Sequence, residues 1–232
     1  MSKPAFDIST ATCQSPPLTD IIDNMNNRDF RKFVPGNIYH IYNRGNNKEK
    51  VFFDEQDYRA FLFRLGLCLG FNEEELNKEK LITMPYSRIR ITETDKNSFK
   101  LHAFSLMPNH FHLLVEQVGD TPISDLMLKL CTSYARYVNL KHKRVGHIFQ
   151  DKFKAVFIEN NPQLMWTSSY IHMNAVKDGI VKHPSEYPWS SYNDYASDRN
   201  LPIVTKELLL ETFGNRKNFI EETLIYDVKG GL

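Results

Sequence analysis

The stretch LHAFSLMPNHFHLLV, residues 101–115, contains the strongest secondary-structure signal in this 232-residue chain. It has two apolar runs, Leu101 to Met107 and Phe111 to Val115, with Pro108 and Asn109 between them. Both separating residues are typical of turns, and apolar runs of this length are typical of buried strands. The stretch therefore predicts a β-hairpin.

A strand and a helix are predicted on the N-terminal side of this hairpin. Residues 38–43 are rich in β-forming residues and end at the turn-like run 44–47. Asp54 can cap a helix, and apolar residues recur after it at helical spacing. These residues are Tyr58, Phe61, Leu62, Leu65 and Leu69. Residues 72–100 are charged and irregular, with one β-like stretch at 87–92, and are expected to be an insertion.

Two helices and a strand are predicted after the hairpin. Thr121 can cap a helix that has Pro122 at its first position, and an apolar stripe follows at helical spacing. The stripe consists of Ile123, Leu126, Met127, Leu130, Tyr134, Tyr137 and Val138. Residues 153–158 are typical of a strand, and residues 161–162 open another helix that Gly179 can end.

The predicted order is strand, helix, strand, strand, helix, strand, and then one more helix. The first six elements match the ferredoxin-like split βαβ arrangement, an α+β fold. In this fold a four-stranded antiparallel sheet carries helices on one face and leaves the other face for a ligand. We expect residues 35–195 to form this domain. Residues 1–34 are expected to be a poorly ordered extension, and residues 196–232 a helical C-terminal extension.

The composition is that of an ordinary globular protein, with 41% hydrophobic residues and a formal net charge of +1. The three cysteines are too few and too scattered for a disulfide framework. The first thirty residues lack the apolar stretch of a signal peptide, and the most apolar window, residues 61–71, contains Arg64 and is about half as long as a membrane span. A cytoplasmic protein without a membrane partner is therefore expected. Taken alone, the near-zero charge argues against a nucleic-acid partner.

Two pairs of residues form a candidate site for a metal ion with a hydroxyl group beside it. His110 and His112 alternate along the second hairpin strand, so their side chains share one face while Phe111 faces the core. Tyr170 and Asn174, four residues apart, share one face of the helix after the last strand. Two imidazoles and an amide oxygen suit Mg²⁺ or Mn²⁺ and leave positions for phosphate oxygens. The alternative is a pair of ordinary surface histidines and a half-buried packing tyrosine.

The segment from Arg136 to Lys154 concentrates positive charge, with a local balance of about +5 and several aromatic residues. This combination is typical of proteins that bind single-stranded nucleic acid. The alternative is a solvated helix end whose carbonyl groups attract cations. The candidate contacts are Arg136, Lys141, Lys143, Arg144, His147, Phe149, Lys152 and Lys154. Arg44 and Asn46, in the turn after the first strand, are candidates of the same kind.

Several short motifs follow one another along the chain. They are NRGNN (43–47), FFD (52–54), MPNHFHLLV (107–115), GHIFQDKFK (146–154) and YIHMNAV (170–176). Together they resemble the single-tyrosine transposases of the HUH class, in particular the REP-associated branch, over about residues 33–195. The chain departs from that family at Ala175, where a proline is usual, and in the insertion 72–100.

The resemblance implies a single-stranded DNA endonuclease and strand-transferase that recognises a hairpin next to its cleavage site. It implies that His110 and His112 hold Mg²⁺ or Mn²⁺ and that Asn174 completes the ligand set. Tyr170 would attack a phosphodiester and become linked to the 5′-phosphate. The sequence leaves both a monomer and a homodimer open.

Two other functions fit parts of the sequence. A non-catalytic protein could use the same basic and aromatic residues to bind structured DNA or RNA. A histidine-based nucleotide hydrolase would need a third histidine where this chain has Leu114. Tyr134 and Tyr137 are rival nucleophiles by residue type, although Tyr134 lies on the apolar stripe. Because acids elsewhere offset the charge of residues 136–154, we expect modest non-specific DNA affinity and recognition of hairpin shape.

Overall fold

The computed structural model describes residues 33–78 and 95–229 of the chain. Its centre is a four-stranded antiparallel sheet in the order β2-β3-β1-β4. The strands are β1 (Ile38–Arg44), β2 (Phe99–Met107), β3 (His110–Gln117) and β4 (Lys154–Phe157). This sheet and the helices around it confirm the predicted α+β, ferredoxin-like fold.

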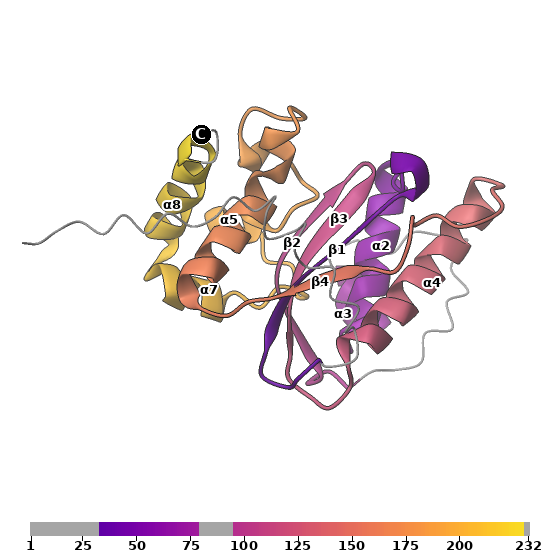
Figure 1. The fold of residues 1–232 in the computed structure, drawn as a ribbon, viewed down its shortest axis with the longest axis horizontal. Coiled ribbons are helices and arrows are strands. Elements are labelled where there is room, and N and C mark those ends of the chain that lie inside the picture. The colour runs from indigo at the N-terminus through magenta and orange to yellow at the C-terminus, as the bar shows by residue number, and fades with distance from the viewer. Residues whose placement is uncertain (1–32, 79–94, 230–232) are drawn as a thin grey trace, which may run out of the picture. The chain divides into compact units, whose positions relative to one another are not determined.

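Helices lie on both faces of the sheet (Figure 1). On one face α2 (Glu55–Cys68) and α4 (Ile123–Lys141) pack against each other. On the other face α5 (Asn161–Lys177) packs on β2 and β3, and α8 (Arg216–Lys229) packs on α5. The remaining elements are η1 (Asn46–Lys48), α3 (Glu73–Lys78), η2 (Pro184–Glu186), α6 (Tyr192–Ala196) and α7 (Glu207–Phe213). Within the described ranges, no helix combines the length and apolar character that a membrane crossing needs.

The core between the sheet and helices α2 and α4 follows the predicted apolar pattern. All residues of the predicted stripe in α4 are buried. The ring of Phe61 in α2 lies 5.1 Å from that of Phe111 in β3 and 5.0 Å from that of Tyr134 in α4, between centroids. Burial of each such ring stabilises the fold by about 1.5–3 kcal/mol. Phe111 therefore anchors β3 in the core, and its neighbours on either side point to the face that carries α5.

Element boundaries differ from the prediction in three places. Pro122, not Thr121, occupies the N-cap position of α4 and offers no side-chain acceptor, so the predicted cap is wrong by one residue. β2 begins at Phe99, inside the predicted insertion, because Phe99 is buried and pairs with Gln117. The predicted insertion also contains α3, whereas its β-like stretch 87–92 lies outside the described residues.

The chain after α5 returns to the outer edge of β2. Leu101 forms a parallel bridge with Val204, and Ser105 forms an antiparallel bridge with Ser190. These contacts satisfy backbone groups that an edge strand would otherwise expose. Segments on both sides of residue 195 thus contact the same strand, and the domain boundary placed there stays a prediction.

Candidate active site

Polar side chains from three strands share the face of the sheet that carries α5. His112 is paired in register with Tyr42, which is paired in turn with Lys154. His110 is paired with Arg44 at the end of the same two strands. Residues paired across antiparallel strands lie on the same face. The two histidines among the predicted metal ligands therefore lie on one face with two of the predicted DNA contacts, Arg44 and Lys154.

Helix α5 brings the other two predicted residues to this face. Its first turn is fixed by Asn160, whose side-chain oxygen accepts the backbone N–H of Gln163 at 2.9 Å. One turn of helix separates Tyr170 from Asn174. Asn174 Oδ1 lies 3.2 Å from His110 Nε2, and the same side chain hydrogen-bonds the Tyr170 hydroxyl. Residues from β3 and α5 thus meet as the sequence predicts.

The protonation of His110 makes this meeting point suitable for a cation. His110 Nδ1 lies 2.6 Å from Asn109 Oδ1, which can only accept a hydrogen bond, so Nδ1 carries the proton. Burial lowers the pKa of His110 and favours the neutral ring, although the hydrogen bond with Asn174 acts in the opposite direction. A neutral ring has one proton, and with that proton at the shorter contact, on Nδ1, Nε2 presents a lone pair. The Oδ1 atom of Asn174 that faces this lone pair is also an acceptor. Neighbouring ligands of an octahedral ion at about 2.1 Å lie about 3 Å apart, so the pair fits Mg²⁺ or Mn²⁺.

The second histidine, His112, has a partner that the sequence-based prediction did not include. Its Nδ1 lies 2.9 Å from Nε2 of His40 in the neighbouring strand β1, and both rings are buried. Burial lowers the pKa of His40 to about 3 and that of His112 well below its usual value, so both rings are neutral near pH 7. Strand alternation places His40 and Tyr42 on one face of β1, but no local pattern shows that β1 lies beside His112.

Tyr170 is half-buried between other rings. Its centroid lies 5.4 Å from that of His112 and 5.7 Å from that of Trp166, which is stacked parallel to it. Burial raises the pKa of the Tyr170 hydroxyl, although the hydrogen bond from Asn174 and the charge of Arg44 act in the opposite direction. The hydroxyl is therefore protonated at neutral pH and must lose its proton to act as a nucleophile.

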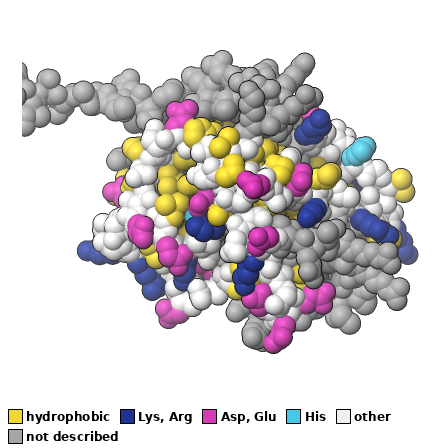
Figure 2. All heavy atoms as spheres, turned by 90° about the horizontal axis from the view of Figure 1, so that it is seen from below, with side chains coloured by type: hydrophobic (Ala, Val, Ile, Leu, Met, Phe, Trp, Pro, Cys, Tyr) yellow, Lys and Arg dark blue, Asp and Glu magenta, His cyan; other side chains and the backbone are white. Residues whose placement is uncertain are grey.

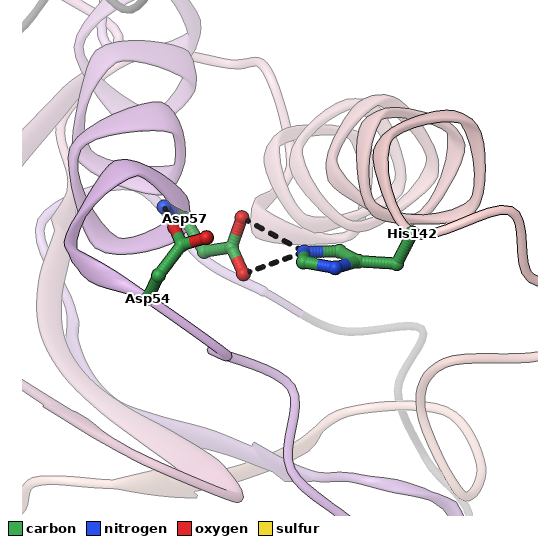
Figure 3. Close-up of side chains that lie close together, drawn as sticks. All are labelled: Asp54, Asp57 and His142. Carbon is green, nitrogen blue, oxygen red and sulfur yellow. Dashed lines mark hydrogen bonds and ion pairs between the residues drawn. The ribbon is translucent and has the colours of Figure 1, made fainter.

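A second cluster of metal-binding side-chain types lies between α2 and α4 (Figure 3). Asp54, Asp57 and His142 place one ligand atom each within 4.8 Å of one another. Lys141 Nζ, however, lies 2.6 Å from Asp54 and 2.8 Å from Asp57, and only 10% of its side chain is exposed. Tyr137 donates its hydroxyl to the same Asp57. The cluster is therefore an ion-pair link between two helices, in which the ammonium group of the predicted DNA contact Lys141 is bound by two carboxylates.

The segment between α4 and β4 returns to the sheet beside Arg44. Gln150 donates its backbone N–H to the Arg44 carbonyl, and Asn46 donates its backbone N–H to the Ile148 carbonyl, both at 2.9 Å. The end of the basic segment is thereby held at the end of β1 that pairs with His110. The predicted contacts that are exposed in this region are Arg44, Asn46, Lys152 and Lys154.

The remaining predicted contacts lie farther along the basic segment. Those exposed in the loop after α4, or on α4 itself, are Lys143, His147 and Arg136. Arg144 forms an ion pair with Glu49 at 3.1 Å, and Phe149 is half-buried with its ring 5.7 Å from that of Phe111. On the face drawn in Figure 2, basic and acidic side chains are interleaved.

Comparison with known proteins agrees with the motifs and with the geometry. The sequence model of the family described as "Transposase IS200 like" matches residues 34–174. A REP-associated tyrosine transposase of Escherichia coli (strain K12) is 24% identical over 141 residues, which are 59% of this chain and 82% of that protein. The solved structure of a REP-associated tyrosine transposase bound to a REP hairpin shares the fold, with a TM-score of 0.51 and 17% identity over 75% of this chain and 88% of that one. The chain belongs to the IS200-like transposase family.

Proposed function

We propose that this protein cleaves single-stranded DNA next to a hairpin and rejoins strands, using a divalent metal ion and a covalent link to Tyr170. The observation that carries the proposal is the meeting of Asn174 Oδ1 and His110 Nε2 at 3.2 Å, with Asn174 also bonded to the Tyr170 hydroxyl. A metal-ligand pair in contact with a nucleophile is the arrangement that phosphodiester transfer needs. The related solved transposase, which is bound to a REP hairpin, supports a hairpin as the substrate.

In this proposal His110, His112 and Asn174 hold Mg²⁺ or Mn²⁺. When bound, such an ion polarises the phosphate and offsets the negative charge that develops on it. All three side chains are neutral ligands, so they do not reduce the positive charge that the phosphate meets. Three protein ligands also leave positions of an octahedral ion for phosphate oxygens.

Tyr170 supplies the nucleophile. Its hydroxyl oxygen attacks phosphorus, the bond from phosphorus to the 3′ oxygen breaks, and the departing 3′ oxygen gains a proton as the hydroxyl loses one. One phosphoester bond replaces another, so a 3′-hydroxyl can reverse the step and rejoin strands without nucleotide hydrolysis. Burial holds the proton on Tyr170, whereas the hydrogen bond from Asn174 and the charge of Arg44 favour its release.

The proposed DNA surface comprises the exposed side chains of the site face and of the adjoining basic segment. Arg44 and Lys154 share the face of the metal-binding histidines. The other members are Asn46, Arg136, Lys143, His147 and Lys152, with Arg144 and Phe149 at the border. Lys141 is left out because Asp54 and Asp57 bind its ammonium group.

The double variant His110→Ala, His112→Ala tests the proposal on an oligonucleotide hairpin with a single-stranded flank. A search of the DNA beside the coding region for short inverted repeats gives the hairpin sequence to test. We expect the unaltered protein to cleave this DNA in Mn²⁺ and not in EDTA. The double variant should bind the hairpin within about threefold of the unaltered protein, because phosphate and shape contacts dominate affinity, but should not cleave it.

The alternative function is a non-catalytic binder of structured DNA or RNA. Tight binding of the hairpin by the unaltered protein, with no cleavage in Mg²⁺ or Mn²⁺, would support that alternative and contradict the proposal. A cytoplasmic location stays a prediction from the sequence, and the proposed chemistry requires neither this location nor a homodimer.

A further inference from the structure

His40 has no role in the chemistry described so far, yet it contacts a proposed metal ligand. It lies in β1, diagonally across from His112 in β3, because Tyr42 is the residue paired with His112. His40 Nε2 is 2.9 Å from His112 Nδ1, which is a normal hydrogen-bond distance. The exposed fractions of the two side chains are 4% and 5%, so little water competes for this bond.

Only one proton can lie between these two nitrogens, and its position decides what His112 can bind. If His40 Nε2 carries the proton and donates it, neutral His112 has its own proton on Nε2 and cannot use that nitrogen as a ligand. If His112 Nδ1 carries the proton and donates it, Nε2 of His112 presents a bare lone pair. His40 then accepts at Nε2 and has its proton on Nδ1.

His110 shows the same arrangement with a different acceptor. Its Nδ1 lies 2.6 Å from the Asn109 side-chain oxygen, which cannot donate, so the proton is on Nδ1 and Nε2 faces Asn174. Metal-binding histidines usually donate their second ring N–H to such an acceptor, which fixes both the tautomer and the ring orientation. The two histidines of β3 thus each have a distinct partner at Nδ1, Asn109 for one and His40 for the other.

We propose that His40 is a positioning residue that accepts the Nδ1–H of His112 and thereby holds His112 with Nε2 available to the metal ion. The inference rests on the proposed function, because it assumes that His110 and His112 bind a divalent cation. An imidazole acceptor orients His112 without adding a negative charge, whereas a carboxylate in its place would repel the phosphodiester. His40 itself does not contact the ion or the DNA in this account.

Two variants of His40 distinguish a role as hydrogen-bond acceptor from a role in packing alone. Glutamine at residue 40 can place Oε1 near the position of the imidazole Nε2 and accept the bond, whereas leucine cannot. We expect His40→Leu to weaken Mn²⁺ binding by about 10–100-fold and His40→Gln by less than about threefold. Binding is measured by electron paramagnetic resonance on the DNA-free protein. His102→Leu is the matched control, because it removes another buried histidine of the sheet, bonded to Glu116, and should leave Mn²⁺ affinity unchanged.

Nuclear magnetic resonance gives a readout that does not depend on a variant. In the Mg²⁺-loaded protein, long-range correlations between ring protons and ¹⁵N should show the His112 proton on Nδ1. A proton on Nε2 of His112 would overturn this inference together with the role of His112 as a metal ligand. Equal Mn²⁺ affinity of folded His40→Leu and unaltered protein would overturn this inference and leave the proposed function intact. Absence of Mn²⁺ binding by the unaltered protein would overturn both. If His40→Leu does not fold, the nitrogen spectrum of the unaltered protein and the Mn²⁺ affinity of His40→Gln decide whether His40 accepts the hydrogen bond.

Discussion

Asn174 Oδ1 and His110 Nε2 lie 3.2 Å apart, although 64 residues separate them and one belongs to helix α5 and the other to strand β3. Both side chains are almost completely buried, and both atoms are acceptors when the proton of the neutral His110 ring is on Nδ1, facing Asn109. This contact joins the hairpin to the helix that carries Tyr170. The close approach of two acceptor atoms, rather than either residue alone, indicates a metal site.

Removal of the amide oxygen should therefore weaken metal binding. We expect Asn174→Ala to lower Mn²⁺ affinity by about tenfold or more, and Asn174→Asp, which keeps an oxygen at the same place, to retain binding. Alanine favours helix more than asparagine does, so α5 should persist. Paramagnetic resonance titration measures the affinities and circular dichroism checks the helix. Equal affinity of Asn174→Ala and the unaltered protein would contradict the assignment of Asn174 as a ligand.

Lys141 should prove to be a structural residue. Lys141→Met leaves Asp57 fully buried without its ammonium partner, which should lower the free energy of unfolding by about 3 kcal/mol. Urea denaturation measures this change, and the exposed Lys152→Met should shift it by less than about 0.5 kcal/mol. A loss of DNA affinity in Lys141→Met without a loss of stability would instead place Lys141 on the DNA surface.

Lys154 should contribute to DNA binding through a phosphate contact. Because it is exposed on the same face as the histidines, Lys154→Met should weaken hairpin binding and reduce the slope of log affinity against log salt by about 0.7 for a single-stranded contact. Fluorescence anisotropy at several salt concentrations measures the slope. An unchanged salt dependence of binding in Lys154→Met would contradict a phosphate contact at this residue.

The Glu116–His102 pair should make stability depend on pH at the far end of the sheet. His102 hydrogen-bonds Glu116 at 2.9 Å and lowers the pKa of that carboxyl, which outweighs the opposite effect of burial. A carboxyl with a lowered pKa stabilises the fold above its unfolded-state value of 4.5, and this contribution is lost as the pH falls through the lower folded-state value. The stability difference between the unaltered protein and Glu116→Gln should thus be present at pH 6 and shrink below about pH 4.5 in urea unfolding. A stability difference between the two proteins that stays constant over this pH range would show that the ionised Glu116 carboxylate does not stabilise the fold.

Much of this architecture is predictable from local pattern. The hairpin 101–115 is specified by its two apolar runs and its turn, and alternation alone assigns His110 and Phe111 to opposite faces. Helical spacing likewise places Tyr170 and Asn174 on one face of α5. Periodicity succeeds in these cases because the side chains concerned are neighbours within one element.

Contacts between distant elements are where local pattern fails. The partnership of His40 with His112 depends on strand order, which alternation within a strand does not contain. A charge count cannot show that Lys141 is neutralised by aspartates more than 80 residues away. The predicted N-cap of α4 is also wrong by one residue, because the preference for threonine at this position does not show at which residue the helix begins.

The central claim is that Tyr170 becomes linked to DNA, and mass spectrometry tests it most directly. The protein is incubated in Mn²⁺ with a hairpin oligonucleotide taken from the DNA beside its coding region, and then digested with trypsin and nuclease. The account predicts a peptide that carries a nucleotide 5′-phosphate on Tyr170, and no such adduct with Tyr170→Phe. An adduct that persists in Tyr170→Phe, or one on Tyr134 or Tyr137 in the unaltered protein, would contradict it.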